Sequence, residues 1–124
     1  MEINEETRGK VKIVGLRGRL DANSSPAVEK ELQALMDRGE ERLVLDLSEL
    51  TYISSLGLRI FIAVAKNIRK VNGRLALAGL NDHIYEIFKI AHFTSIFSIY
   101  PSCEEAVVYC ADREGSEDSA RFQR

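Results

Sequence analysis

The pattern of hydrophobic and polar positions divides the chain into strand-like and helix-like segments, and one stretch contains both kinds. Residues 43–62 read LVLDLSELTYISSLGLRIFI. Leu43 to Leu47 are nearly all apolar, as in a strand covered on both faces of a parallel sheet. Residues 48–53 are predicted to be a short connection. From Ser54 onward the apolar residues recur at three- and four-residue steps, which predicts a helix whose inward stripe is Leu58, Phe61, Ile62, Ala65 and Ile68.

The segments before this stretch predict a β-hairpin followed by a helix. Two runs with apolar positions lie within residues 1–20, separated by the turn residues Arg8-Gly9-Lys10. Ser25 as the cap and Pro26 at the first helical position then indicate a helix start. Gly39 ends this helix, as glycine does in a left-handed cap.

The segments after it continue the alternation. The helix that begins at Ser54 is predicted to run to about Asn72 and to be ended by Gly73. A short apolar strand follows at residues 75–78. A third helix is predicted from residue 81, and a last strand at residues 96–100. Ser102 and Glu105 form a capping box for a final helix that runs to about Arg113. This order predicts an α/β fold with an opening β-hairpin, a mixed or parallel central sheet and about four helices.

Composition narrows the class of protein. The 124 residues, 45% hydrophobic and 29% charged, suit one globular domain over residues 1–113. The polar segment 114–124 predicts a disordered tail. The net charge of -2 comes without a lysine or arginine block, so we expect no nucleic-acid partner. No apolar run nears the roughly 20 residues of a membrane helix, and the acidic N-terminus lacks a signal-peptide core, which predicts a cytoplasmic protein without membrane insertion.

Two cysteines, Cys103 and Cys110, lie seven residues apart in the predicted final helix. That spacing separates them by ~10 Å, which exceeds the reach of a disulfide. No histidines stand at a spacing that would complete a zinc site. We therefore expect two small thiols that fill space in the core, with no metal and no cofactor.

The candidate chemistry lies at Ser54-Ser55, where the strand passes into the helix. The first turn of a helix has backbone N–H groups without a helical partner, and these carry a partial positive charge. A serine there either caps the helix or presents its hydroxyl beside a site for an anion. Gly57, without a side chain, predicts room for a partner or a phosphate to approach the backbone. The structural alternative is that one serine caps and the other fills space.

The residues Asp46-Leu47-Ser48 followed by Tyr52 to Leu58 resemble the central motif of the STAS domain. This is the domain of bacterial anti-sigma factor antagonists and of the cytoplasmic ends of sulphate transporters. Ser55 falls on the serine that a partner kinase phosphorylates in that family, and Gly57 matches the family's glycine. Two positions depart from the family pattern, because Ser54 stands at the usual aspartate and Leu56 at the usual small residue.

A second resemblance lies at Gly18-Arg19-Leu20-Asp21, which is similar to the run that closes the second strand in STAS domains. It places Asp21 on the edge that faces a partner, whereas its position ahead of a helix equally suits a turn or cap residue. The resemblance covers about residues 1–113 and implies the compact STAS fold. The partner-binding residues that it implies are Asp21, Ser54, Ser55, Leu56, Gly57 and Arg59.

The resemblance implies an anti-sigma factor antagonist, which is a binding protein and not an enzyme. Unmodified, such a domain binds an anti-sigma factor that is also a serine kinase, and so releases a sigma factor. Phosphorylation of Ser55 ends that binding. Ser54 is the second candidate for the phosphorylated residue. A phosphatase that removes the phosphate is a further partner. Ser54 in place of aspartate keeps an alternative open, in which the domain is a non-phosphorylated scaffold subunit of a transport or signalling complex. The oligomeric state stays open.

Enzymatic functions find little support in the residues. A serine nucleophile needs a base and an oxyanion hole, and the G-x-S-x-G elbow is absent. The two histidines, His83 and His92, lie in or beside the third predicted helix, and His83 is expected at the surface. The glycine-rich phosphate-binding motifs are absent as well. The sequence therefore favours a binding module.

Overall fold

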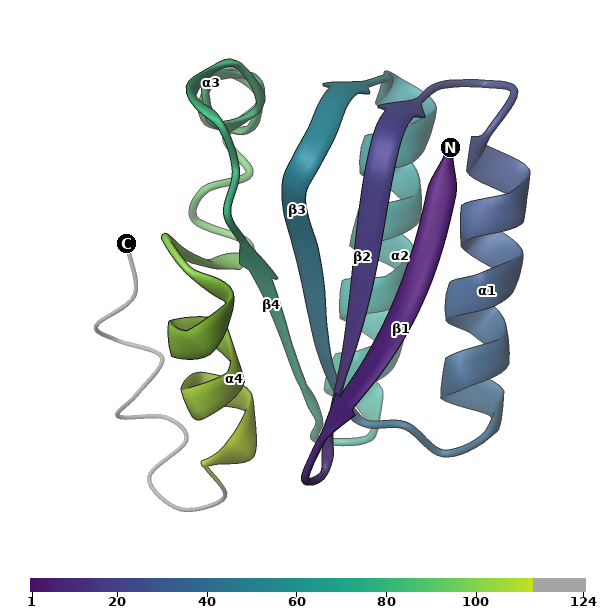
Figure 1. Ribbon diagram of the computed structural model, residues 1–124, viewed down its shortest axis with the longest axis vertical. Helices are drawn as coiled ribbons and strands as arrows, with labels where there is room; N and C mark the ends of the chain where they lie inside the picture. Colours follow the sequence, from purple (N-terminus) through teal and green to yellow (C-terminus); the bar gives the residue numbers. More distant parts are fainter. Residues whose placement is uncertain (113–124) are drawn as a thin grey trace.

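A computed structural model describes residues 1–112, which form a five-stranded mixed sheet with four helices around it (Figure 1). The strands lie side by side in chain order, β1-β2-β3-β4-β5. β1 runs antiparallel to β2, and every later pair is parallel. The strand bounds are β1 Glu2–Arg8, β2 Val11–Leu20, β3 Arg42–Ile53, β4 Arg74–Ala78 and β5 Ser98–Tyr100. The predicted α/β fold with its opening hairpin is confirmed.

The helices are divided between the two faces of the sheet. Their bounds are α1 Ser25–Asp37, α2 Ser55–Lys70, α3 Asp82–Ile90 and α4 Cys103–Ala111. Helices α1 and α2 lie together on one face, α4 lies against the other, and α3 lies near the C-terminal end of β3 (Figure 1). None of these helices is long and apolar enough to cross a membrane.

Each face of the sheet has its own hydrophobic cluster. Leucines of β2 and β3 pack with α1 and α2, where Leu32 and Phe61 are fully buried. On the other face, small residues of β4 lie against α4, and Ala76 and Ala78 pack with Ala106 and Cys110. The small side chains of this strand let α4 pack close to the sheet.

The inward stripe of α2 differs from the predicted one. The buried residues are Gly57, Ile60, Phe61, Val64 and Ile68, whereas Leu58, Ile62 and Ala65 are only half-buried. Helix α2 contacts both the sheet and α1, so apolar residues extend around more of its circumference than one stripe. The sequence pattern therefore indicated the helix correctly and its orientation only in part.

The predicted connection at residues 48–53 was wrong, because β3 continues to Ile53. The pairing of β3 with β2 shifts register twice over this segment, and β3 contributes the extra residue each time. Such bulges break the alternation of a strand. The buried residues therefore come at every third position, Leu47, Leu50 and Ile53, instead of every second.

Several element ends differ from the predicted ones. The N-cap of α1 is Ser24, and Ser25 is the first helical residue. Gly39 does take the left-handed conformation predicted for it, with φ of 90°. After α2, however, the left-handed residue is Asn72 and not Gly73. Helix α4 ends at Ala111 and not Arg113, and the predicted tail at 114–124 lies outside the described residues.

Candidate functional site

The two serines at the start of α2 have different surroundings. Ser54 donates its backbone N–H to the carbonyl of Leu20 at 2.9 Å, which joins the ends of β2 and β3. Its side chain is the N-cap of α2, because Ser54 Oγ accepts the N–H of Gly57 at 3.2 Å. Ser55 is exposed, and within residues 1–112 its hydroxyl makes no hydrogen bond. One serine therefore caps the helix, and the other presents an unused hydroxyl to solvent.

Gly57 has a different purpose from the one that the sequence suggested. It is buried, and a Cβ placed on it would lie 2.8 Å from Leu20 Cγ and 3.0 Å from Ile53 Cγ1. Its missing side chain thus lets α2 approach the sheet, and the interpretation that it leaves room for a partner was wrong. Leu56 is half-buried and Arg59 is exposed, so both reach the surface near Ser55.

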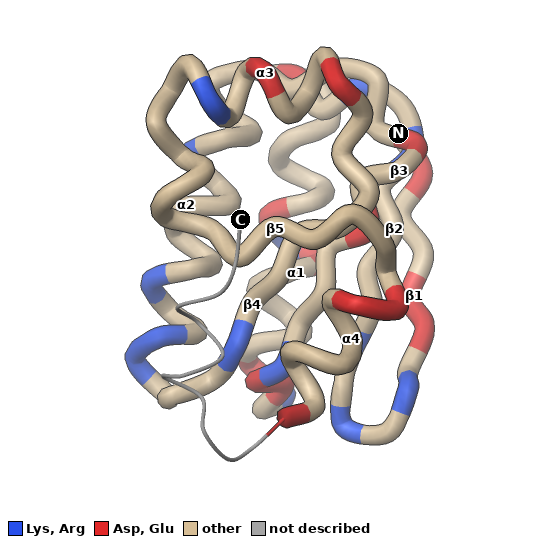
Figure 2. The backbone as a smooth tube through the Cα atoms, turned by 90° about the vertical axis from the view of Figure 1, so that its left-hand side faces the viewer, with Lys and Arg blue, Asp and Glu red and all other residues tan. Residues whose placement is uncertain are grey.

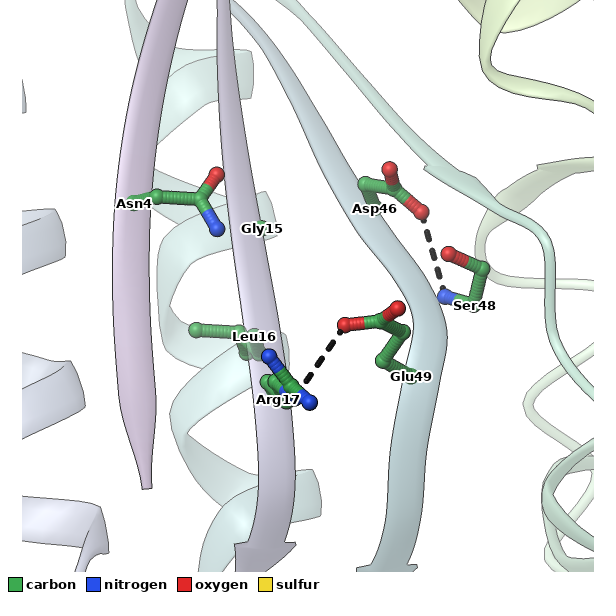
Figure 3. Close-up of a pocket in the computed structure, with 7 residues that line it drawn as sticks. All are labelled: Asn4, Gly15, Leu16, Arg17, Asp46, Ser48 and Glu49. Atoms are coloured by element: carbon green, nitrogen blue, oxygen red, sulfur yellow. Dashed lines mark hydrogen bonds and ion pairs between the residues drawn. The ribbon is translucent and has the colours of Figure 1, made fainter.

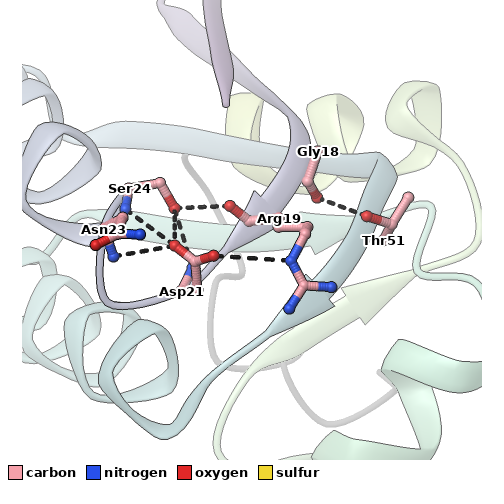
Figure 4. Close-up of polar contacts among 6 residues, drawn as sticks. All are labelled: Gly18, Arg19, Asp21, Asn23, Ser24 and Thr51. Carbon is pink, nitrogen blue, oxygen red and sulfur yellow. Dashed lines mark hydrogen bonds and ion pairs between the residues drawn. The ribbon is translucent and has the colours of Figure 1, made fainter.

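Asp21 organises the turn between β2 and α1 (Figure 4). Its Oδ1 accepts the backbone N–H groups of Asn23 at 3.0 Å and Ser24 at 3.1 Å. The hydroxyl of Ser24 in turn donates to the carbonyl of Arg19 at 2.6 Å. The backbone hydrogen bond from Ser24, followed by that from Asn23, lowers the pKa of the Asp21 carboxyl. The interpretation of Asp21 as a turn residue is therefore confirmed.

Arg19 and Tyr52 form a stacked pair beside this turn. The guanidinium carbon of Arg19 lies 4.2 Å from the centroid of the Tyr52 ring, and Arg19 Nε lies 3.7 Å from Asp21 Oδ2. Arg19 and Asp21 line an open hollow of about 500 Å³, together with Met1 and Ile3. Sequence reasoning missed the pair, because the register that aligns Arg19 with Tyr52 follows the bulges of β3.

A second hollow, of about 220 Å³, lies on the sheet face opposite α1 and α2 (Figure 3). The charged side chains that line it are already engaged. Arg17 Nε lies 3.5 Å from Glu49 Oε1, and Asp46 Oδ1 accepts the N–H of Ser48 at 3.1 Å. This hollow therefore offers no unused charged pair to a ligand.

Charge is distributed unevenly over the elements around the site. In Figure 2 several acidic residues lie along β1, and several lysines and arginines lie along α2. Within residues 1–112 no group of three or more His, Cys, Asp or Glu side chains is arranged to hold a metal ion. The site therefore consists of an accessible serine hydroxyl, a hydrogen-bonded turn with an acidic residue, and a cationic helix.

Comparison with known proteins places this geometry in a family. The STAS domain profile matches residues 2–106, which is most of the chain.

The chain belongs to the STAS domain family.

Its curated relatives are anti-sigma factor antagonists by name. BtrV of Bordetella bronchiseptica, which carries that name, is 46% identical over 94 residues, 76% of this chain and 81% of BtrV. The anti-sigma-B factor antagonist of Listeria monocytogenes is 30% identical over 99 residues, 80% of this chain and 86% of the relative. Each match spans most of both proteins.

Solved structures confirm the fold. The structure of the antagonist SpoIIAA in its unphosphorylated form matches with a TM-score of 0.75 at 16% identity, over 86% of this chain and 93% of SpoIIAA. The phosphorylated form of Bacillus SpoIIAA matches with a TM-score of 0.69 at 16% identity, over 86% of this chain and 97% of that one. At this identity the likeness shows that the STAS fold is shared.

Proposed function

We propose that this STAS domain is an anti-sigma factor antagonist whose binding is ended by phosphorylation of Ser55. The observation that supports the proposal is that the two serines at the start of α2 differ in their hydrogen bonding and exposure. Ser54 uses its side chain to cap the helix, whereas Ser55 is exposed with an unengaged hydroxyl. A kinase can reach that hydroxyl without breaking any hydrogen bond that the fold needs. The names of the relatives support the same function.

The binding surface in this proposal lies where the C-terminal ends of β2 and β3 meet the start of α2. Its members are Asp21, Ser54, Ser55, Leu56 and Arg59. Gly57 lies beneath this surface, where it packs against Leu20 and Ile53. The partner is an anti-sigma factor that also acts as the serine kinase, and a phosphatase reverses the modification. The stacked residues Arg19 and Tyr52 extend the same surface beyond Asp21.

The modification is a phosphoryl transfer. Ser55 Oγ forms a bond to the γ-phosphorus of ATP held by the kinase, the bond from that phosphorus to the bridging oxygen breaks, ADP leaves, and the hydroxyl proton passes to a base of the kinase. The product carries between -1.5 and -2 additional charges near neutral pH. The domain itself tolerates this charge at a helix N-terminus. The phosphate must be desolvated when it faces a partner surface that is complementary to a neutral hydroxyl, and its charge is repelled there. Both effects weaken binding.

The alternative, a non-phosphorylated scaffold, rested on serine at the family's usual aspartate position. The side chain of Ser54 caps α2, and aspartate is an equally good N-cap residue. The substitution thus preserves the local structure around Ser55. The relatives named as antagonists do not favour the scaffold function either.

The proposal is tested by incubation with ATP and the candidate anti-sigma kinase, followed by intact mass and peptide mapping. We expect one phosphate on the unmodified sequence and none on Ser55→Ala. The matched control is Ser54→Asp, which keeps a capping side chain at that position and should still accept one phosphate. A phosphate that maps to Ser54, or one that persists in Ser55→Ala, would show that Ser55 is not the acceptor.

A further inference from the structure

Every charged residue of helix α2 is cationic. Its residues include Arg59, Lys66, Arg69 and Lys70 and no aspartate or glutamate. The last three lie toward the C-terminal half, where positive charge is favourable to the helix dipole. Arg59 is the exception, because it lies in the second turn of α2, far from the C-terminal end where a cation is favourable.

Arg59 also lacks an ionic partner within the part of the chain that the structure describes. The ion pairs recorded for residues 1–112 join residues of β1, β2, β3 and the segments that flank α1, and none of them includes α2. Arg59 is exposed as well, so packing does not hold its guanidinium in place. The fold therefore leaves this charge free.

The spacing of Arg59 relative to Ser55 is that of neighbours on a helix surface. The two residues are four apart, both lie within α2 and both are exposed. Side chains at positions i and i+4 have their Cβ atoms about 5–6 Å apart, within reach of a direct ion pair. The guanidinium offers a fork of N–H donors that matches the oxygens of a phosphate.

We propose that Arg59 is the intramolecular partner of phosphorylated Ser55, and binds the phosphate along the surface of α2. This inference rests on the proposed function only in taking Ser55 as the modified residue. In the unmodified domain, Arg59 is free to contact the anti-sigma factor. In the phosphorylated domain the phosphate engages it, so one modification both adds a negative charge to the surface and withdraws a positive one.

The experiment uses the full chain with phosphoserine incorporated at position 55 during synthesis, so it requires no kinase. The phosphorus NMR signal is followed through a pH titration in the wild-type background and in Arg59→Gln. An ion pair stabilises the dianion, so the phosphate pKa, ordinarily about 6, should be lower with Arg59 present. For an exposed pair we expect a difference of roughly half a unit, about threefold in proton affinity.

Two further variants distinguish a direct ion pair between Arg59 and the phosphate from the general effect of positive charge on α2. Lys66→Gln removes one charge from the same helix three turns from Ser55 and should leave the phosphate pKa within about 0.1 unit of wild type, because screening weakens such distant charges. Arg59→Lys keeps the charge and should retain most of the shift. Equal phosphate pKa values in wild type and Arg59→Gln, or equal shifts in Arg59→Gln and Lys66→Gln, would overturn the inference. Neither result would contradict the proposal that phosphorylation of Ser55 ends partner binding, because kinase labelling and binding measurements test that proposal separately.

Discussion

Gly57→Ala is the most informative single change to the packing beneath the site. The added Cβ would lie 2.8 Å from Leu20 Cγ, 2.9 Å from Leu20 Cδ2 and 3.0 Å from Ile53 Cγ1. Leu20 is fully buried and Ile53 is 4% exposed, so neither can move into solvent. Overpacking of this kind costs about 1–3 kcal/mol. The better helix propensity of alanine returns at most about 1 kcal/mol. With an overpacking cost of about 2 kcal/mol, the middle of that range, we expect a net loss of about 1–2 kcal/mol.

Thermal and urea unfolding measure this loss. For a domain of this size it corresponds to a melting temperature lower by roughly 4–8 °C. Ala63→Gly, at an exposed position of the same helix, provides the control, because it reports the propensity difference without a packing change. If Gly57→Ala melts at or above the wild-type temperature, the helix does not need this glycine to approach the sheet, and the packing argument is refuted.

Other predictions concern the capping serine, the acidic turn and the thiols. Ser54→Ala should cost about 1 kcal/mol of stability through the lost cap, while Ser55→Ala should change stability by less than about 0.5 kcal/mol; equal melting curves for the two would contradict the assigned roles. The folded-state pKa of Asp21 is lowered below its ordinary value of 3.8, so its stabilisation is present above that value and lost as pH falls through the folded pKa. Wild type should accordingly be more stable than Asp21→Asn at neutral pH, and the gap should narrow in acid; a gap that widens in acid would contradict this. Burial raises the pKa of the Cys110 thiol to about 12, so iodoacetamide near pH 8 should label the half-buried Cys103 first and Cys110 only after unfolding.

The order of elements was predictable because each segment carries its own local signal. Apolar runs, capping residues such as Ser102 and the glycine after α1 determine where strands and helices begin and end with little help from the rest of the chain. The errors arose where tertiary contacts override local pattern. At the bulged end of β3 every third residue is buried. This spacing differs from the alternation expected of a strand, so the sequence pattern predicted that the strand ends there.

The candidate site was predictable in part. The motif located Ser55 and Asp21, and the structure places Ser55 at the surface and Asp21 in a turn. The function of Gly57 was misread, because only the packing against Leu20 and Ile53 shows which way its missing side chain would point. The stack of Arg19 on Tyr52 was missed, because strand register is a property of the assembled sheet.

The central claim is that phosphate on Ser55 ends partner binding without unfolding the domain. Calorimetric titration of the anti-sigma factor with the unmodified and the phosphorylated chain, with melting curves of both, tests it most directly. A charge buried in a protein interface without a partner on the facing surface costs about 2 kcal/mol or more, so phosphorylation should weaken binding by roughly thirtyfold or more, while Ser55→Ala should bind as the unmodified chain does. Equal affinities of the phosphorylated and unmodified chains, with both folded, would contradict the claim.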